Sequence, residues 1–92
     1  MNTGSTTDKR RRRLLFRCWH RGTKEVDILL GGFADEHVGS MDDSELDKLE
    51  QLLEQNDIDL YNWITAKFPW PANIENEITA ALSAFCAEGK HR

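Results

Sequence analysis

The sequence predicts an all-α fold, a small antiparallel five-helix bundle. Apolar residues recur at spacings of three and four in five successive segments, and no segment shows the sustained apolar and polar alternation of an exposed strand. Short connections between such helices favour antiparallel packing. With 92 residues the chain is long enough for one domain only. We therefore expect a flexible head over residues 1–7, one helical domain over residues 8–89 and a short tail over residues 90–92.

The first predicted helix starts at Asp8, which suits an N-cap, and runs to about His20. Arginines occupy its outer faces. Its inward-facing residues follow helical spacing and are Leu15, Cys18 and Trp19.

A second predicted helix is capped by Thr23 and runs to about Val38, where Gly39 suits a stop. Its apolar stripe consists of Val26, Leu29, Leu30, Phe33 and His37. Gly31 and Gly32 interrupt this stripe at a cost of about 1 kcal/mol each relative to alanine. We therefore expect a neighbouring helix to cross closely at this point.

Start and stop signals delimit three further helices. Asp42-x-x-Glu45 resembles a capping box that opens the third helix, which ends near residues 55–56. Asp57 caps a short fourth helix, and a fifth begins at about Asn73 after a stiff loop with two prolines. The inward-facing residues of these helices are Leu46, Leu49 and Leu53, then Leu60, Trp63 and Ile64, then Ile74, Ile78, Ala81, Leu82 and Phe85.

Composition excludes several classes of protein. The longest apolar runs, such as Ile28-Leu29-Leu30, are far shorter than the roughly 20 residues of a membrane-spanning helix. Residues 1–7 lack the apolar segment of a secretory signal. Cys18 and Cys86 fit neither a zinc nor a redox spacing, so we expect free thiols in a reducing compartment.

Charge is divided unevenly along the chain. Residues 1–24 hold eight Lys/Arg and one acidic residue, whereas residues 25–92 hold four Lys/Arg and fifteen acidic residues. Such a basic end on an acidic body favours oriented docking to a charged partner. The Arg10-Arg11-Arg12-Arg13 run also suggests a nucleic-acid arm or a mitochondrial presequence. We expect neither, because the run surrounds the helix and the same segment supplies core residues.

Signals for other chemistry are weak. Cys18-x-His20 and Asp35-Glu36-His37 offer donor atoms, but neither completes a metal-ligand set. His37 falls on the apolar face of the second helix, where we expect a histidine at the edge of the core. Neither cysteine is paired with a recognisable base and orienting group. We predict no metal site and no catalytic residue, and hence a protein that is not an enzyme.

The segment Arg21-Gly22-Thr23-Lys24-Glu25-Val26-Asp27 places a glycine between two helices and surrounds it with charges of both signs. A glycine exposes the backbone, so such a turn can dock closely against another molecule. Glu25 lies in the first turn of the second helix, where the helix dipole favours a carboxylate. Two interpretations remain open: charge compensation at the helix end, or contact with a partner.

Arg21-Gly22-x-x-Glu25-x-Asp27, followed by Phe33-Ala34-Asp35-Glu36-His37, resembles the SdhE-type flavinylation factors, which are assembly factors of succinate dehydrogenase. The resemblance extends from about residue 13 to residue 87. Further matches in order and spacing are Leu52-Leu53-Glu54, Asp57-x-Asp59-Leu60-x-Asn62-Trp63 and the loop with two prolines before the last helix.

The resemblance implies a protein that binds the flavoprotein subunit of succinate dehydrogenase, or of fumarate reductase, and promotes covalent attachment of FAD to a histidine of that subunit. The chemistry would belong to the partner, and we expect no tightly bound cofactor on this chain. Arg21, Gly22 and Glu25 match the family motif and should lie on the docking face, and Asp27 matches its extension. We expect a monomer when free, in the bacterial cytoplasm rather than the mitochondrial matrix, without nucleic-acid binding or membrane insertion.

Two other functions remain open: an enzyme that itself transfers FAD, and an adaptor that binds nucleic acid through the basic N-terminal helix. The first should bind FAD alone and show saturable turnover. The second should bind DNA or RNA with a steep salt dependence.

Overall fold

Five α-helices and one turn of 3-10 helix form the chain in a computed structural model that describes residues 4–89. In chain order they are α1 (Gly4–Trp19), α2 (Lys24–His37), η1 (Val38–Ser40), α3 (Asp43–Leu52), α4 (Asp57–Ile64) and α5 (Glu77–Ala87). The described residues contain no strand, and the predicted all-α fold is confirmed. Residues 1–3 of the predicted head and the predicted tail, residues 90–92, lie outside the described range, whereas α1 already begins within that head.

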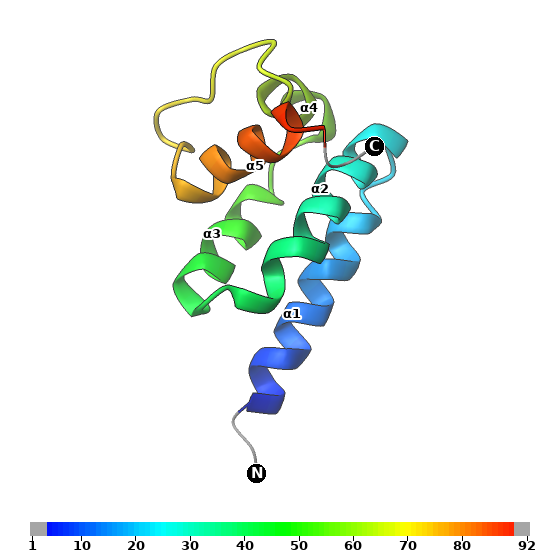
Figure 1. Cartoon of the computed structure of the whole chain (residues 1–92), viewed down its shortest axis with the longest axis vertical. Helices are drawn as coiled ribbons and strands as arrows, with labels where there is room; N and C mark the ends of the chain where they lie inside the picture. The colour runs from blue at the N-terminus through cyan, green and yellow to red at the C-terminus, as the bar shows by residue number, and fades with distance from the viewer. Residues whose placement is uncertain (1–3, 90–92) are drawn as a thin grey trace.

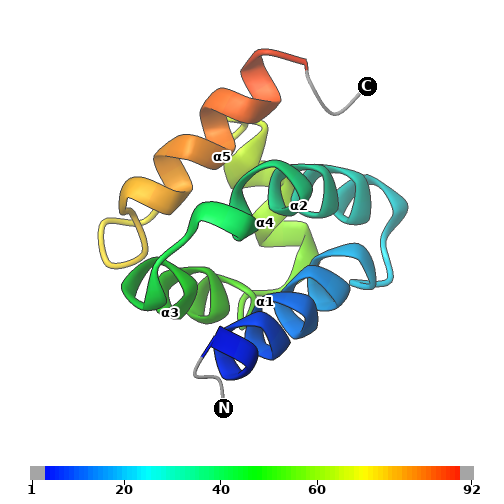
Figure 2. The same cartoon turned by 60° about the horizontal axis from the view of Figure 1, so that its bottom comes forward.

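Helix α2 occupies the middle of the bundle, where it contacts α1, α4 and α5. α1 and α2 run antiparallel, side by side, and are joined by a short turn (Figure 1). α3 packs against α1 and also against α5, as the tilted view shows (Figure 2). Side chains of the α1–α2 turn bond to Asp57 at the start of α4, so these two distant parts of the chain meet.

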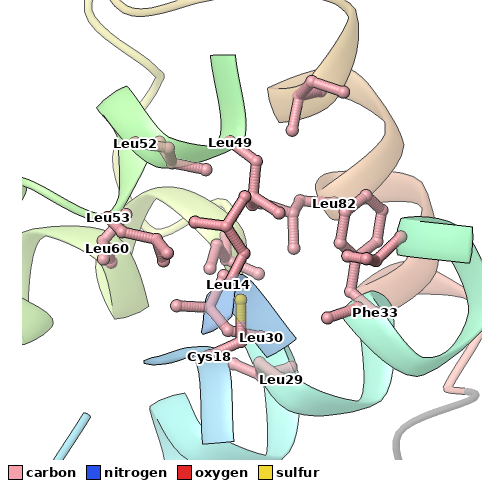
Figure 3. Packing of buried hydrophobic residues seen from close by; sticks show 14 of the residues in the cluster. Leu14, Cys18, Leu29, Leu30, Phe33, Leu49, Leu52, Leu53, Leu60 and Leu82 are labelled. Atoms are coloured by element: carbon pink, nitrogen blue, oxygen red, sulfur yellow. The ribbon is translucent and has the colours of Figure 1, made fainter. Parts of the chain in front are cut away.

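One apolar core fills the space between the helices (Figure 3). Full burial of each large apolar side chain contributes roughly 1.5–3 kcal/mol to stability. The predicted inward-facing residues of the last four helices that are buried are Val26, Leu29, Leu30, Phe33, Leu46, Leu49, Leu53, Leu60, Ile64, Ile78, Leu82 and Phe85. Trp63, Ile74 and Ala81 pack against this core while partly buried. His37 is half-buried and stacks on Phe33, so it lies at the core edge as predicted.

The buried face of α1 differs from the predicted one. Leu14 and Cys18 are buried, Leu15 is only partly buried, and Trp19 is 36% exposed. Residues four apart lie one above the other on a helix, so Leu14 and Cys18 together form a stripe that points into the core. Leu15 and Trp19 form the adjacent stripe, which is turned toward the edge of the α1–α2 contact.

The paired glycines of α2 lie where neighbours approach closely, which confirms the expectation of a tight crossing. A Cβ atom at Gly31 would overlap the indole ring of Trp19 on α1. A Cβ atom at Gly32 would lie 3.1 Å from the ring of Phe85 on α5. The Trp19 Nε1 donates a hydrogen bond to Asp35 Oδ1 at 3.2 Å, which fixes the indole over the glycine.

Side-chain caps determine where α3 begins, as predicted. Asp42 Oδ1 accepts from the N–H of Glu45 at 2.8 Å, and Glu45 Oε1 accepts from the N–H of Asp42 at 3.0 Å, which completes a capping box. The predicted start of α1 is wrong, because Asp8 lies inside that helix. Its carboxylate pairs with Arg11 one turn later at 3.5 Å and so supports the helix from within.

The last two helices begin at asparagine caps that the sequence analysis did not identify. Asn56, rather than Asp57, caps α4 and accepts from the N–H three residues on at 2.8 Å. α5 begins at Glu77 rather than near Asn73. The cause is Asn76, whose side-chain oxygen accepts from the N–H groups two and three residues on, at 2.9 and 3.1 Å.

Candidate partner-docking site

The turn between α1 and α2 contains a glycine in a left-handed backbone conformation. Gly22 has a φ of +105°, which residues with a side chain rarely adopt. Within residues 4–89, no atom beyond its two chain neighbours lies within 4 Å of the place that a Cβ would occupy. The backbone conformation, rather than crowding within the chain, therefore requires glycine. Gly22 is exposed, so its main chain is open to contact by another molecule.

Arg21 ties this turn to the two helices that follow α2. Its Nε donates to Asp57 Oδ1 at 2.9 Å, at the start of α4. Its two terminal nitrogens donate to the carbonyl oxygens of Leu53 and Gln55, just after α3. The Arg21 side chain is only 13% exposed. The structure therefore engages this guanidinium inside the chain, where it holds the end of α3 and the start of α4 against the turn.

Asp27 and Thr23 complete the same network. Asp27 Oδ1 accepts a hydrogen bond from the backbone N–H of Arg21 at 2.6 Å, which closes the turn. Thr23 is the N-cap residue of α2, as predicted, but its hydroxyl forms no capping hydrogen bond with the helix. The hydroxyl donates to Asp57 Oδ2 at 2.9 Å instead. Arg21 and Thr23 together satisfy both carboxylate oxygens of Asp57.

Glu25 is the exposed carboxylate of this turn. It lies in the first turn of α2, and its side chain forms no hydrogen bond or ion pair with any residue that the structure describes. Of the four predicted docking residues, Gly22 and Glu25 are thus presented at the surface. Arg21 and Asp27 are bonded within the turn and shape it.

A shallow groove of about 290 Å³ opens beside Glu25, between the start of α2 and α4. The residues that line it are Thr23, Glu25, Asp57, Ile58, Tyr61 and Asn62. Ile58 is 76% exposed and Tyr61 is 40% exposed, and both line the same groove. Neighbouring exposed apolar side chains, unlike single ones, indicate a contact surface. The groove therefore combines one unpaired carboxylate with an exposed apolar wall.

Sequence reasoning missed the α4 side of this groove. The signal was present, because Leu60 and Ile64 form the buried stripe of α4 while Ile58 and Tyr61 fall outside that stripe. Ile58 and Tyr61 are three residues apart and share a helix face. Two apolar residues on an outward face indicate a contact surface, but only the fold shows that Glu25 lies beside them.

Comparison with known proteins assigns the chain to a family. The family described as the flavinator of succinate dehydrogenase matches residues 12–86, which include the turn, Glu25 and all of α4. This chain belongs to the flavinator family. The predicted resemblance is thereby confirmed.

Assembly factors from a bacterium and from mitochondria are similar to this chain. The FAD assembly factor SdhE of Acetobacter pasteurianus is 47% identical over 83 residues, which cover 90% of this chain and 73% of that protein. The mitochondrial succinate dehydrogenase assembly factor 2 of Candida glabrata is 40% identical over 89 residues, covering 92% of this chain and 58% of the yeast protein. That of Dictyostelium discoideum is 35% identical over 85 residues, with 92% and 60% covered. The chain thus spans about three-fifths of these two mitochondrial relatives.

The basic first helix of this flavinator-family chain has much of its charge paired within the fold. Arg10 forms ion pairs with Asp47 and Glu50 of α3, the latter at 3.0 Å. Arg17 pairs with Glu54 at 3.5 Å. The acidic α3 therefore neutralises part of the basic α1, and fewer guanidinium groups are left for phosphates. Together with the family match, this pairing disfavours the nucleic-acid adaptor.

The remaining chemical groups offer no second site. Cys18 is buried, and burial raises the pKa of its thiol to about 12, so the thiol stays protonated at neutral pH and is a poor nucleophile. Among the residues that the structure describes, no three His, Cys, Asp or Glu side chains are grouped so that they could hold a metal ion. Within the same range, every helix is too short or too polar to cross a bilayer.

Proposed function

We propose that this chain is an assembly factor that binds the flavoprotein subunit of succinate dehydrogenase and promotes covalent attachment of FAD to it. The observation that carries the proposal is the turn at Gly22, which is exposed and is followed three residues later by the exposed carboxylate of Glu25, while Arg21 bonds the turn to Asp57 at the start of α4. Membership of the flavinator family and the names of its relatives support the same function.

The chain acts as a docking partner and not as an enzyme in this proposal. Covalent flavin attachment requires a histidine of the flavoprotein subunit to be placed against its own FAD, so the reacting groups belong to the partner. A helper that binds one arrangement of the partner more tightly than others shifts the population toward that arrangement. Such a role needs surface complementarity, which Gly22 and Glu25 offer, and no tightly bound cofactor on this chain.

The proposed function also includes a second client protein, an oligomeric state and a cellular location for this chain. The flavoprotein subunit of fumarate reductase is included in the proposal as a second client. In this proposal the free chain is a monomer and acts in the bacterial cytoplasm; the 47% identity to a bacterial assembly factor supports the bacterial location.

Covalent flavin measured at limiting amounts of the assembly factor tests this function. The flavoprotein subunit is co-expressed with wild-type chain, with Glu25→Ala, or with Asp43→Ala, and covalent flavin is read as in-gel fluorescence after denaturation. Asp43 is the matched control, because it is an exposed acidic residue in the first turn of α3. Loss of either first-turn carboxylate should cost only about 0.3–1 kcal/mol of stability.

We expect wild type and Asp43→Ala to support covalent flavin and Glu25→Ala to leave the subunit with little. Normal flavin with Glu25→Ala would show that this carboxylate serves only to compensate the charge of the helix end. Saturable binding of FAD to the purified chain, with turnover, would replace the docking role by an enzyme that transfers FAD.

A further inference from the structure

We propose that the groove beside Glu25 receives one arginine side chain of the flavoprotein subunit, with its guanidinium paired to Glu25 and stacked on Tyr61. The proposal rests on the proposed function and adds to it the residues of α4 and the chemistry of the contact. It follows from the size, the charge and the apolar wall of the groove.

The size of the groove fits a single side chain. Pockets for small organic ligands usually enclose about 300–1,000 Å³. The groove measures about 290 Å³ and is open to solvent, so it is too small to enclose a cofactor of the size of FAD. One long side chain from a docked surface can fill it.

The negative charge of the groove favours binding of a cation. It contains two carboxylates, Glu25 and Asp57. Asp57 is already balanced, because it receives 2.9 Å hydrogen bonds from Arg21 and from Thr23. Glu25 has no partner among the described residues, so one carboxylate of the groove is left without a hydrogen bond or an ion pair. A cation that docks here gains an ion pair without disturbing the Asp57 network.

The apolar wall selects arginine. Ile58 and Tyr61 are exposed and can cover the aliphatic stem of a long side chain. The planar guanidinium stacks on an aromatic face and donates in its own plane, whereas the lysine ammonium is compact and strongly hydrated. A guanidinium on the ring of Tyr61 can therefore still donate to Glu25 and to the amide oxygen of Asn62, which lines the same groove.

Conservative variants separate the charge from the aromatic face. Glu25→Gln removes the charge and keeps the shape, Tyr61→Leu removes the aromatic face and keeps an apolar side chain, and Tyr61→Phe keeps the ring. Phe68→Leu is the control, because Phe68 is 53% exposed and does not line the groove. Affinity for the purified flavoprotein subunit is measured by titration calorimetry at low and moderate salt.

We expect Tyr61→Leu to weaken binding about 2- to 30-fold, the range of a cation–π contact. Tyr61→Phe keeps the ring and should restore most of the affinity that Tyr61→Leu loses, whereas the control Phe68→Leu should bind as wild type does. Glu25→Gln should weaken binding and reduce its salt dependence. The double variant should lose less than the product of the two single losses, because both residues hold the same cation. Equal binding by wild type and Tyr61→Leu, or strictly multiplicative losses, would overturn the proposal.

Chemical protection identifies the cation on the partner. Phenylglyoxal modifies arginine, and mass spectrometry reports which arginines of the flavoprotein subunit are shielded in the complex. We expect one arginine to be shielded by wild type and to become reactive with Tyr61→Leu. If no arginine of the subunit is shielded in this way, the arginine contact is refuted, while covalent flavin formation with wild type would leave the proposed function standing.

Discussion

Replacement of Arg21 by alanine should destabilise the fold, although Arg21 belongs to the motif that the sequence assigns to docking. The side chain makes three charge-assisted hydrogen bonds, to Asp57 and to the carbonyl oxygens of Leu53 and Gln55. Each such bond contributes about 1.5–3 kcal/mol, for a gross total of roughly 4.5–9 kcal/mol. Ordering the long side chain costs about 2 kcal/mol, and Asp57 is 21% exposed, so water and Thr23 still solvate its carboxylate in the variant.

Subtracting the ordering cost leaves roughly 2.5–7 kcal/mol. Solvation of Asp57 in the variant reduces this further, so the expected loss on Arg21→Ala is about 2–4 kcal/mol in the free energy of unfolding. For a domain of this size that loss lowers Tm by about 10–30 °C. Urea denaturation followed by circular dichroism measures it, and Glu25→Ala serves as the matched variant with little expected loss. Arg21→Lys should fall between wild type and alanine, because an ammonium keeps the charge but cannot reach the three acceptors in one plane.

The refuting result for Arg21 is specific. If Arg21→Ala unfolds within about 0.5 kcal/mol of wild type and nevertheless fails to bind the flavoprotein subunit, the guanidinium contacts the partner and the intramolecular network is not its role. If it is destabilised and binding returns when the sample is cooled below its transition, the structural role stands.

Two further predictions concern the turn and the core. Gly22→Ala and Gly22→Arg should each lower the free energy of unfolding by about 1–2 kcal/mol, because both place a side chain at a left-handed φ. Only Gly22→Arg should abolish pull-down of the flavoprotein subunit, because its bulk blocks approach to the backbone. Equal binding by the two variants would contradict close approach of the partner at this turn. In the folded chain iodoacetamide at about pH 8 should alkylate Cys86 and spare Cys18, with both labelled after denaturation, as mass spectrometry will show. The pKa of the Cys18 thiol is about 12 in the folded chain and 9.0 when exposed, so the unfolded chain loses this proton first as the pH rises. The free energy of unfolding should therefore be insensitive to this thiol below about pH 9 and should fall above it by up to about 1.4 kcal/mol per pH unit. Cys18→Ala should lack this contribution to the slope.

Local chemistry was sufficient to predict the helices. The Asp42 and Glu45 capping box and the apolar stripe of α3 act within a few residues, so the sequence identifies them directly. One error, the cap of α4, lies where two neighbouring polar residues compete for one role. Asn56 and Asp57 are both good caps, and Asp57 is drawn away from capping by Arg21, which lies 36 residues earlier.

The motif itself shows the limit of local reasoning. The sequence by itself determined that a glycine turn joins two helices, that Glu25 opens the second, and that Gly31 receives a close neighbour. Only the tertiary structure decided that the Arg21 side chain donates its hydrogen bonds to the end of α3 and the start of α4, while Glu25 stays unpaired in the groove that Tyr61 also lines. The physical reason is that hydrogen bonds and pairing depend on which groups meet in space, and these partners are separated by more than 30 residues of chain.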